Sequence, residues 1–199
     1  MKTENYLDPE KLTKLQYDIW ENATAHGWHE KPLSPEHYCG LIMTEMSEAV
    51  EADRNGRRAK TDMMKDVMNT QKHGLGLTKQ WYETWFQVYY KEYIKGSIEE
   101  EFADVVIRVL DMAQEVHGNK MRWLGYYPYG MVYHDSKSFI ENAWYFVRDV
   151  LNWGTMNISD CVSFMYDWAH DLSIDLDLHI EWKMKYNEMR PYKHGGKKY

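Results

Sequence analysis

Signals for helix starts recur along the chain, and each is followed by apolar residues at helical spacing. Asp8-Pro9 and Ser34-Pro35 each place a capping side chain before a proline at the first helical position. Gly96-Ser97, with Glu100 three residues beyond the serine, forms a capping box. No segment shows sustained period-two alternation of apolar and polar residues, as a half-buried strand would. The sequence therefore predicts an all-α protein.

The 199 residues suit one compact domain, and we expect 1–199 to form it. A loop is expected over 118–135. Two of the expected helices carry stripes at helical spacing. The first, expected to pack, is formed by Trp81, Trp85, Val88 and Tyr89, and the second by Ile140, Ala143, Trp144, Val147 and Leu151. The expected helices cover residues 9–26, 35–54, 61–72, 80–95, 98–117, 138–152, a segment that starts at Ser159, and 175–190.

Composition excludes several classes of protein. Two cysteines, Cys39 and Cys161, cannot build a disulfide framework, which fits a reducing cytoplasm. No apolar run approaches the roughly 20 residues that a membrane span needs, and no secretory signal is evident. We therefore expect a cytoplasmic protein with no membrane partner.

Charge is divided unevenly along the chain. Residues 183–199 hold six Lys and Arg against one Glu, a balance of +5, and because the whole chain carries −7 the remainder carries −12. An acidic body disfavours binding to a nucleic-acid polymer. A basic tail beside acidic residues suits a small phosphorylated ligand whose charge is bridged by a metal, although a solvated tail gives the same pattern.

Two pairs of acids are each separated by one helical turn. Glu45 and Glu48 lie in the helix expected over 35–54, and at ~100° per residue the apolar side chains around them place Glu45 within the face that packs on the core. An unpaired buried carboxylate is costly enough that it normally neutralises, pairs or binds a metal. Glu45 is therefore difficult to explain as a surface residue.

The second pair, Glu101 and Asp104, belongs to a polar ridge on an otherwise apolar helix. A solvated face with salt bridges is the commoner meaning of such a ridge, but a helix this apolar should be buried on most sides, so that the ridge faces an interior cleft. Its other members are Arg108, Asp111 and Glu115.

The two pairs together offer four carboxylates, Glu45, Glu48, Glu101 and Asp104, with no nitrogen or sulfur ligand. Such oxygen ligands favour Mg²⁺, with Mn²⁺ as a substitute, over zinc or iron. Carboxylate-bridged di-iron bundles use Glu-x-x-His twice, and neither pair is followed by that histidine.

At this point the residues resemble a known family. Glu45-x-x-Glu48 followed by Glu101-x-x-Asp104 is similar to the acidic signature of the MazG-like, all-α nucleoside triphosphate pyrophosphohydrolases, and a downstream element with Lys183, Asn187 and Arg190 resembles that family's phosphate-binding element. The matching segments cover roughly 10–57, 96–117 and 173–199. The resemblance implies a helical bundle of MazG-like type, with inserted helices at about 58–95 and 119–172.

The chain departs from the family pattern in two ways. Thr44 stands where the family often has a first glutamate, so one outer acid is absent. The chain is also long for the family, and the second insertion is expected to be a helical hairpin that packs beside the core, mediates dimerisation or walls the nucleotide pocket.

The resemblance implies hydrolysis of a (deoxy)nucleoside triphosphate to the monophosphate and pyrophosphate. Glu45, Glu48, Glu101 and Asp104 would hold Mg²⁺, and a metal-activated water would attack the α-phosphorus. Glu45 and Glu48 are the catalytic candidates, with Glu48 accepting the proton of that water. It also implies a homo-oligomer, a dimer or a tetramer.

The last helix supports a phosphate site by its geometry. Lys183, Tyr186, Asn187 and Arg190 fall on one of its faces, within about 60° of Lys183, and suit triphosphate oxygens, although a solvated basic face has the same pattern. Trp28 is the candidate ring for stacking on the base, or else a wedge between helices.

Two other functions stay open. A non-catalytic helical scaffold or regulator that binds a nucleotide or a protein would retain the fold, and the missing acid at Thr44 allows it. A related phosphohydrolysis, of a nucleoside diphosphate derivative, would release orthophosphate instead. His26, His29 and His194 are given no role at this stage.

Overall fold

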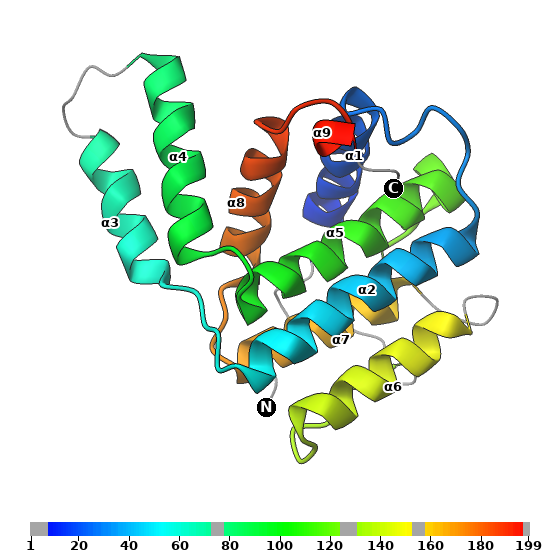
Figure 1. The fold of residues 1–199 in the computed structure, drawn as a ribbon. Helices are drawn as coiled ribbons and strands as arrows, with labels where there is room; N and C mark the ends of the chain where they lie inside the picture. The colour runs from blue at the N-terminus through cyan, green and yellow to red at the C-terminus, as the bar shows by residue number, and fades with distance from the viewer. Residues whose placement is uncertain (1–7, 73–77, 124–130, 153–157, 197–199) are drawn as a thin grey trace.

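The chain folds into helices in a computed structural model that describes residues 8–72, 78–123, 131–152 and 158–196 (Figure 1). No strand occurs within these ranges, so the all-α prediction is confirmed for them. The helices are α1 (Pro9–Ala25), α2 (Pro35–Arg54), α3 (Thr61–Lys72), α4 (Lys79–Tyr93), α5 (Ile98–His117), the 3₁₀ turn η1 (Gly118–Lys120), α6 (Phe139–Leu151), α7 (Ile158–Asp171), α8 (Leu176–Glu188) and α9 (Lys193–Gly196). The loop expected over 118–135 begins with η1, and its residues 124–130 lie outside the described part of the chain.

Capping side chains begin the helices where the sequence predicts. Ser34 accepts a hydrogen bond from the backbone N–H of His37, and Ser97 accepts one from that of Glu100 at 3.2 Å. The Glu100 carboxylate, however, accepts from the N–H of Gly96 and not from that of Ser97. The expected capping box is therefore only half formed, because Glu100 is engaged elsewhere.

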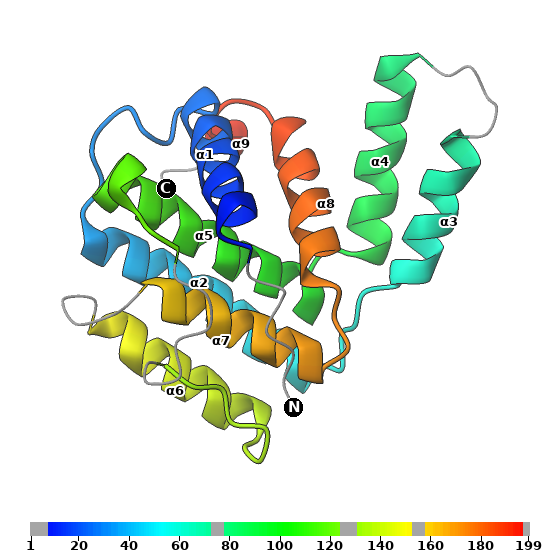
Figure 2. The ribbon, with the colours of Figure 1, turned by 180° about the vertical axis from the view of Figure 1, so that it is seen from behind.

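Helix α5 lies at the centre of the molecule. It packs against α1, α2, α7 and α8, and most of its residues are buried (Figures 1 and 2). Val105, Val106 and Leu110 are fully buried on the apolar sides. The helix is thus enclosed on most sides, as its apolar composition predicts.

Helices α6 and α7 lie within the segment predicted as the second insertion and pack against α2 and α5. Phe146 and Val150 of α6 and Phe164 and Trp168 of α7 belong to the same hydrophobic cluster as α2 and α5. Of the three placements considered, packing against the core is the one that the described residues of α6 and α7 show, and a part in dimerisation stays a prediction.

The hairpin of α3 and α4 projects from the rest of the molecule (Figure 1). Its apolar residues form, with residues of α8, a cluster separate from the main core. Phe86 and Tyr90 of α4 pack with Trp182 and Tyr186 of α8, with Met64 of α3 beside them. This cluster joins the hairpin to α8.

The packing stripes predicted for α4 and α6 are wrong in part. Trp81 and Val88 of α4 and Ile140, Trp144 and Leu151 of α6 are exposed. The buried residues of α4 are Phe86 and Tyr90, which the predicted stripe does not include. Of the buried apolar residues of α6, the predicted stripe includes Ala143 but not Phe146 or Val150. Both helices have apolar residues on two faces, so periodicity alone did not decide which face packs.

No helix of the described residues is both long and apolar enough to cross a membrane.

Candidate functional site

Three carboxylates meet where α2 runs along α5. Glu45 comes from α2, and Glu101 and Asp104 come from successive turns of α5. One oxygen of each lies within 4.8 Å of the others. The close packing of α2 on α5 brings Glu45 to the acids of the second pair, as the helical-face argument predicts.

A hollow of about 300 Å³ opens above these carboxylates, between α1, α2, α5 and α8. Its walls mix charge and apolar surface, since Ile19, Leu41 and Ile107 line it together with the acids. Among the described residues, none from α3, α4, α6 or α7 lines it, although Lys95, just after α4, does. The hollow is therefore built from the segments in which the motif matches lie.

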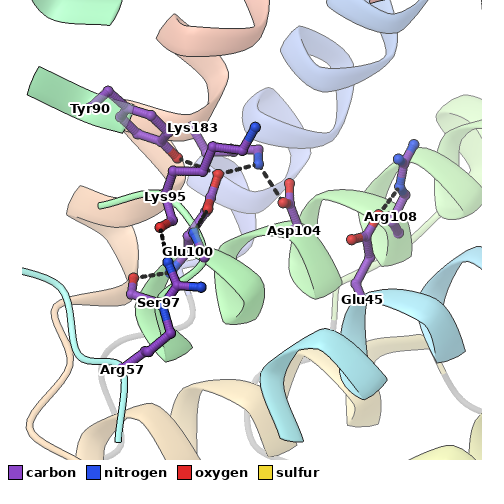
Figure 3. A network of polar contacts seen from close by, with 10 residues as sticks. Glu45, Arg57, Tyr90, Lys95, Ser97, Glu100, Asp104, Arg108 and Lys183 are labelled. Carbon is purple, nitrogen blue, oxygen red and sulfur yellow. Dashed lines mark hydrogen bonds and ion pairs between the residues drawn. The ribbon is translucent and has the colours of Figure 1, made fainter. Parts of the chain in front are cut away.

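Two basic side chains neutralise part of the acidic cluster (Figure 3). The Nε atom of Arg108 lies 3.0 Å from an oxygen of Glu45. The Nζ atom of Lys183 lies 2.5 Å from an oxygen of Asp104 and 2.6 Å from an oxygen of Glu100. Glu45 and Asp104 thus each contact one cation of the protein itself.

Glu100 is the most deeply buried acid of this group, with 2% of its surface exposed. It accepts hydrogen bonds from the hydroxyl of Tyr90 at 3.2 Å and from the N–H of Gly96, as well as the Lys183 ammonium (Figure 3). Burial acts to raise the pKa of Glu100, but the charge of Lys183 and these hydrogen bonds outweigh it, so the pKa is lowered. Glu100 is therefore an ionised partner for Lys183.

In contrast to Glu100, the two acids of α5 that converge with Glu45, namely Glu101 and Asp104, have raised pKa values. Burial, with the charges of Asp104 and Glu100, raises the pKa of Glu101 to about 9. Burial also raises the pKa of Asp104 to about 7, against the opposing charge of Lys183. The Glu101 carboxyl group therefore retains its proton at neutral pH, whereas Asp104 is paired with the Lys183 ammonium.

The residues present fit a hard divalent cation. Their donors are carboxylate oxygens, which Mg²⁺ and Mn²⁺ prefer, and three of them converge from two helices. A cation placed between these carboxylates would also offset the charges of Asp104 and Glu100, which, after burial, contribute to the raised pKa of Glu101.

Most of the residues named from the sequence line this one hollow. Glu48 lines it with an exposed side chain but is not one of the three converging acids. Lys183, Asn187, Arg190 and Trp28 also line it.

Two residues of α8, Asn187 and Tyr186, differ in their relation to the hollow. The Oδ1 atom of Asn187 is buried with no hydrogen-bond partner among the described residues, so a ligand donor would satisfy it. Tyr186 does not line the hollow: it is buried against Tyr90, with the ring centroids 4.5 Å apart and the rings nearly parallel.

Sequence reasoning missed several members of the site. Glu100 was interpreted only as part of a helix cap, and Arg108 only as one residue of a ridge. His194 lines the hollow and lies edge-on to Trp28, with ring centroids 5.2 Å apart. Its position after Pro191, in a short tail, gave no periodic signal that could have placed it.

His29, which received no role, proves to be buried beside the site. Its Nε2 atom lies 2.9 Å from an oxygen of Asp111, and its Nδ1 atom lies 3.6 Å from one of Glu115. The polar ridge of α5 therefore faces protein and the hollow along its length, and not open solvent.

A scan against models of protein families, a search of curated proteins and a search of solved structures each found no match to this chain. The similarity to MazG-like enzymes therefore depends on the residues and motifs of the sequence.

Proposed function

We propose that this protein is a MazG-like, magnesium-dependent hydrolase that converts a (deoxy)nucleoside triphosphate to the monophosphate and pyrophosphate. The observation that carries the proposal is the convergence of Glu45, Glu101 and Asp104 within 4.8 Å, on the wall of a hollow that is also lined by Lys183 and Arg190. Carboxylates that could bind a cation and positively charged side chains that could bind phosphates thus line the same hollow.

Glu45, Glu101 and Asp104 would hold the cation, and Glu48 stands at the same wall. Bound Mg²⁺ would supply positive charge to the triphosphate and lower the pKa of a water molecule. Glu48, an exposed acid that lines the hollow, would accept the proton of the attacking water. Attack at the α-phosphorus breaks the bond to the bridging oxygen, and pyrophosphate leaves.

The opposite wall would bind the rest of the nucleotide. The Arg190 guanidinium is suited to bidentate contact with phosphate oxygens, and the Asn187 amide would orient a further oxygen. Trp28 offers a ring face to the base, beside His194.

The deciding experiment is an assay of pyrophosphate release over a panel of canonical and modified NTPs and dNTPs, with Mg²⁺, Mn²⁺ or EDTA. We expect metal-dependent release that falls at least about 100-fold in Glu101→Gln and Asp104→Asn, because loss of groups that only orient metal ligands already costs about 10- to 100-fold. Glu51→Gln, an exposed acid on α2, is the matched control and should keep its activity.

Full Mg²⁺-dependent turnover in Glu101→Gln would contradict the ligand assignment. Release of orthophosphate instead of pyrophosphate would indicate the related phosphohydrolase.

A non-catalytic nucleotide- or protein-binding scaffold is the second candidate. It is favoured by the ion pairs of Glu45 with Arg108 and of Asp104 with Lys183, which satisfy two acids of the cluster without a metal. Nucleotide binding by calorimetry, without turnover of any substrate, would support it.

The expected homo-oligomer also remains a proposal. Exposed Ile140, Trp144 and Leu151 on one face of α6 are compatible with a subunit contact. The mass of the particle in solution, from light scattering, tests it.

A further inference from the structure

Lys183 occupies an unusual position for a residue expected to bind phosphate. Its side chain is 9% exposed, and its ammonium lies between Asp104, at 2.5 Å, and Glu100, at 2.6 Å. An ammonium group has three N–H donors, and two of them are directed at these carboxylates. Lys183 therefore contributes charge to the acidic cluster more directly than to the open hollow.

The two acids that hold Lys183 differ in their surroundings. Glu100 is fixed by the Tyr90 hydroxyl and the Gly96 N–H, on the side of the hollow away from Glu45. Asp104 is one of the three converging acids and receives, among the described residues, no hydrogen bond other than that of Lys183. A cation that binds Asp104 would thus displace the ammonium from Asp104 but not from Glu100.

Arg108 provides a useful contrast. It neutralises Glu45 in the same way, but its side chain is 31% exposed, so that it can turn towards solvent when Glu45 takes another partner. The buried Lys183 side chain cannot turn towards solvent in this way. When Asp104 binds a cation, Glu100 therefore has to keep the charge of Lys183 paired within the protein.

We propose that Lys183 is a built-in counter-ion that competes with a divalent cation for Asp104, and that Glu100 is the positioning residue that retains Lys183 beside the site when the cation binds. The inference rests on the proposed metal site. The proposal sets the order of two binding events. Binding of the cation would release one N–H of Lys183 from Asp104, and that N–H could then donate to a phosphate oxygen in the hollow. Binding of the cation and of the triphosphate would thereby favour each other.

Titration of the full-length protein with Mn²⁺ alone, followed by electron paramagnetic resonance, tests the inference without nucleotide or turnover. We expect Lys183→Met to bind Mn²⁺ at least about tenfold more tightly, since a unit charge in contact with Asp104 is removed from a largely desolvated position. Lys95→Met removes a lysine charge from the rim of the same hollow and should change the affinity no more than about twofold, as expected for an exposed charge.

Glu100→Gln should have the opposite effect and weaken Mn²⁺ binding, because Lys183 would then pair with Asp104 alone. Removing the charge of any nearby acid weakens Mn²⁺ binding, whether or not that acid acts through Lys183. The decisive comparison is therefore the double variant Lys183→Met/Glu100→Gln. If Glu100 acts through Lys183, the Glu100→Gln effect should be much smaller when Lys183 is absent. The double variant also removes the charge of Glu100 together with that of its partner Lys183, so that it protects the test if Lys183→Met alone does not fold.

Two outcomes would overturn the inference in distinguishable ways. If the wild type binds Mn²⁺ but removal of Lys183 changes its affinity no more than Lys95→Met does, both with Glu100 present and with the Glu100→Gln substitution, the counter-ion role is wrong and the proposed metal site stands. If the wild type binds no Mn²⁺ at all, the proposed function fails, and this inference fails with it.

Discussion

His29 shows how one buried side chain couples the protein to pH. Its imidazole, 5% exposed, contacts Asp111 and Glu115 of α5 and stacks on Trp20 of α1. Burial acts to lower the pKa of His29, but the hydrogen bond and charge of Asp111 and the charge of Glu115 raise it on balance. A histidine whose pKa is raised by folding stabilises the protein below its unfolded pKa, and that contribution is lost as pH rises through the folded pKa.

We therefore predict that His29→Gln destabilises the protein more at pH 6 than at pH 9. The expected loss is about 2 kcal/mol at pH 6, where the hydrogen bond to Asp111 is charge-assisted, and about 1 kcal/mol at pH 9, where it is neutral. Urea denaturation at the two pH values measures it. His134→Gln, at an exposed position, is the control. An equal loss at both pH values would show that His29 does not carry the pH dependence.

Single residues also show why the site was only partly predictable from the sequence. Glu45 could be assigned to the packed face of its helix because its neighbours at helical spacing are apolar, and it does meet Glu101 and Asp104. His29 lies in a connection, where no periodicity restricts the direction of a side chain. Lys183, predicted to bind phosphate, lines the hollow, but its contact with Glu100 depends on how α8 packs on α5, which local sequence does not encode.

At the scale of helices, strong end signals made the bounds predictable. The expected segments 35–54 and 98–117 agree with α2 and α5 residue for residue, since Ser34-Pro35 and Gly96-Ser97 are specific starts. The face that packs was less predictable. Helix α4 carries aromatic residues all round, and only its docking against Trp182 and Tyr186 of α8 selects the buried side.

That docking yields a prediction about α4. Phe86 is 1% exposed and packs in the cluster between the hairpin and α8. Phe86→Ala should lower the free energy of unfolding by about 3 kcal/mol or more, as large cavities in a core do. Trp81→Ala, on the exposed side of the same helix, should cost less than about 0.5 kcal/mol. Chemical denaturation of both variants measures the difference, and equal losses would mean that the hairpin does not dock through Phe86.

At the scale of the whole molecule, the site links parts of the chain that are far apart in sequence. Glu45 and Asp104 are separated by the entire α3–α4 hairpin, yet α2 and α5 pack side by side. Helices α6 and α7 close the core from the other side without contributing to the lining of the hollow. A ligand that binds both α2 and α5 therefore recognises the assembled fold, because an unfolded chain does not gather these carboxylates.

A divalent cation should consequently stabilise the folded protein against heat. If the three carboxylates bind Mg²⁺ with a Kd near 1 mM, 10 mM Mg²⁺ adds about 1.4 kcal/mol of stability, from the mass-action relation for a ligand that binds only the native state. For a chain of this size the rise in Tm is about 2–4 °C per kcal/mol. Differential scanning calorimetry, with an ionic-strength-matched sodium salt as the reference, separates this effect from screening.

Asp104→Asn removes a converging ligand and should abolish the rise in Tm, whereas Glu51→Gln on the outer face of α2 should preserve it. Asp104→Asn also takes away a partner of Lys183, so its Tm without Mg²⁺ will differ from that of the wild type. The informative quantity is therefore the change in Tm on adding Mg²⁺ within each variant. If the rise in Tm with Mg²⁺ persists in Asp104→Asn, the cation binds elsewhere on the acidic surface. The prediction that Mg²⁺ stabilises the fold by binding ligands from both α2 and α5 would then be wrong.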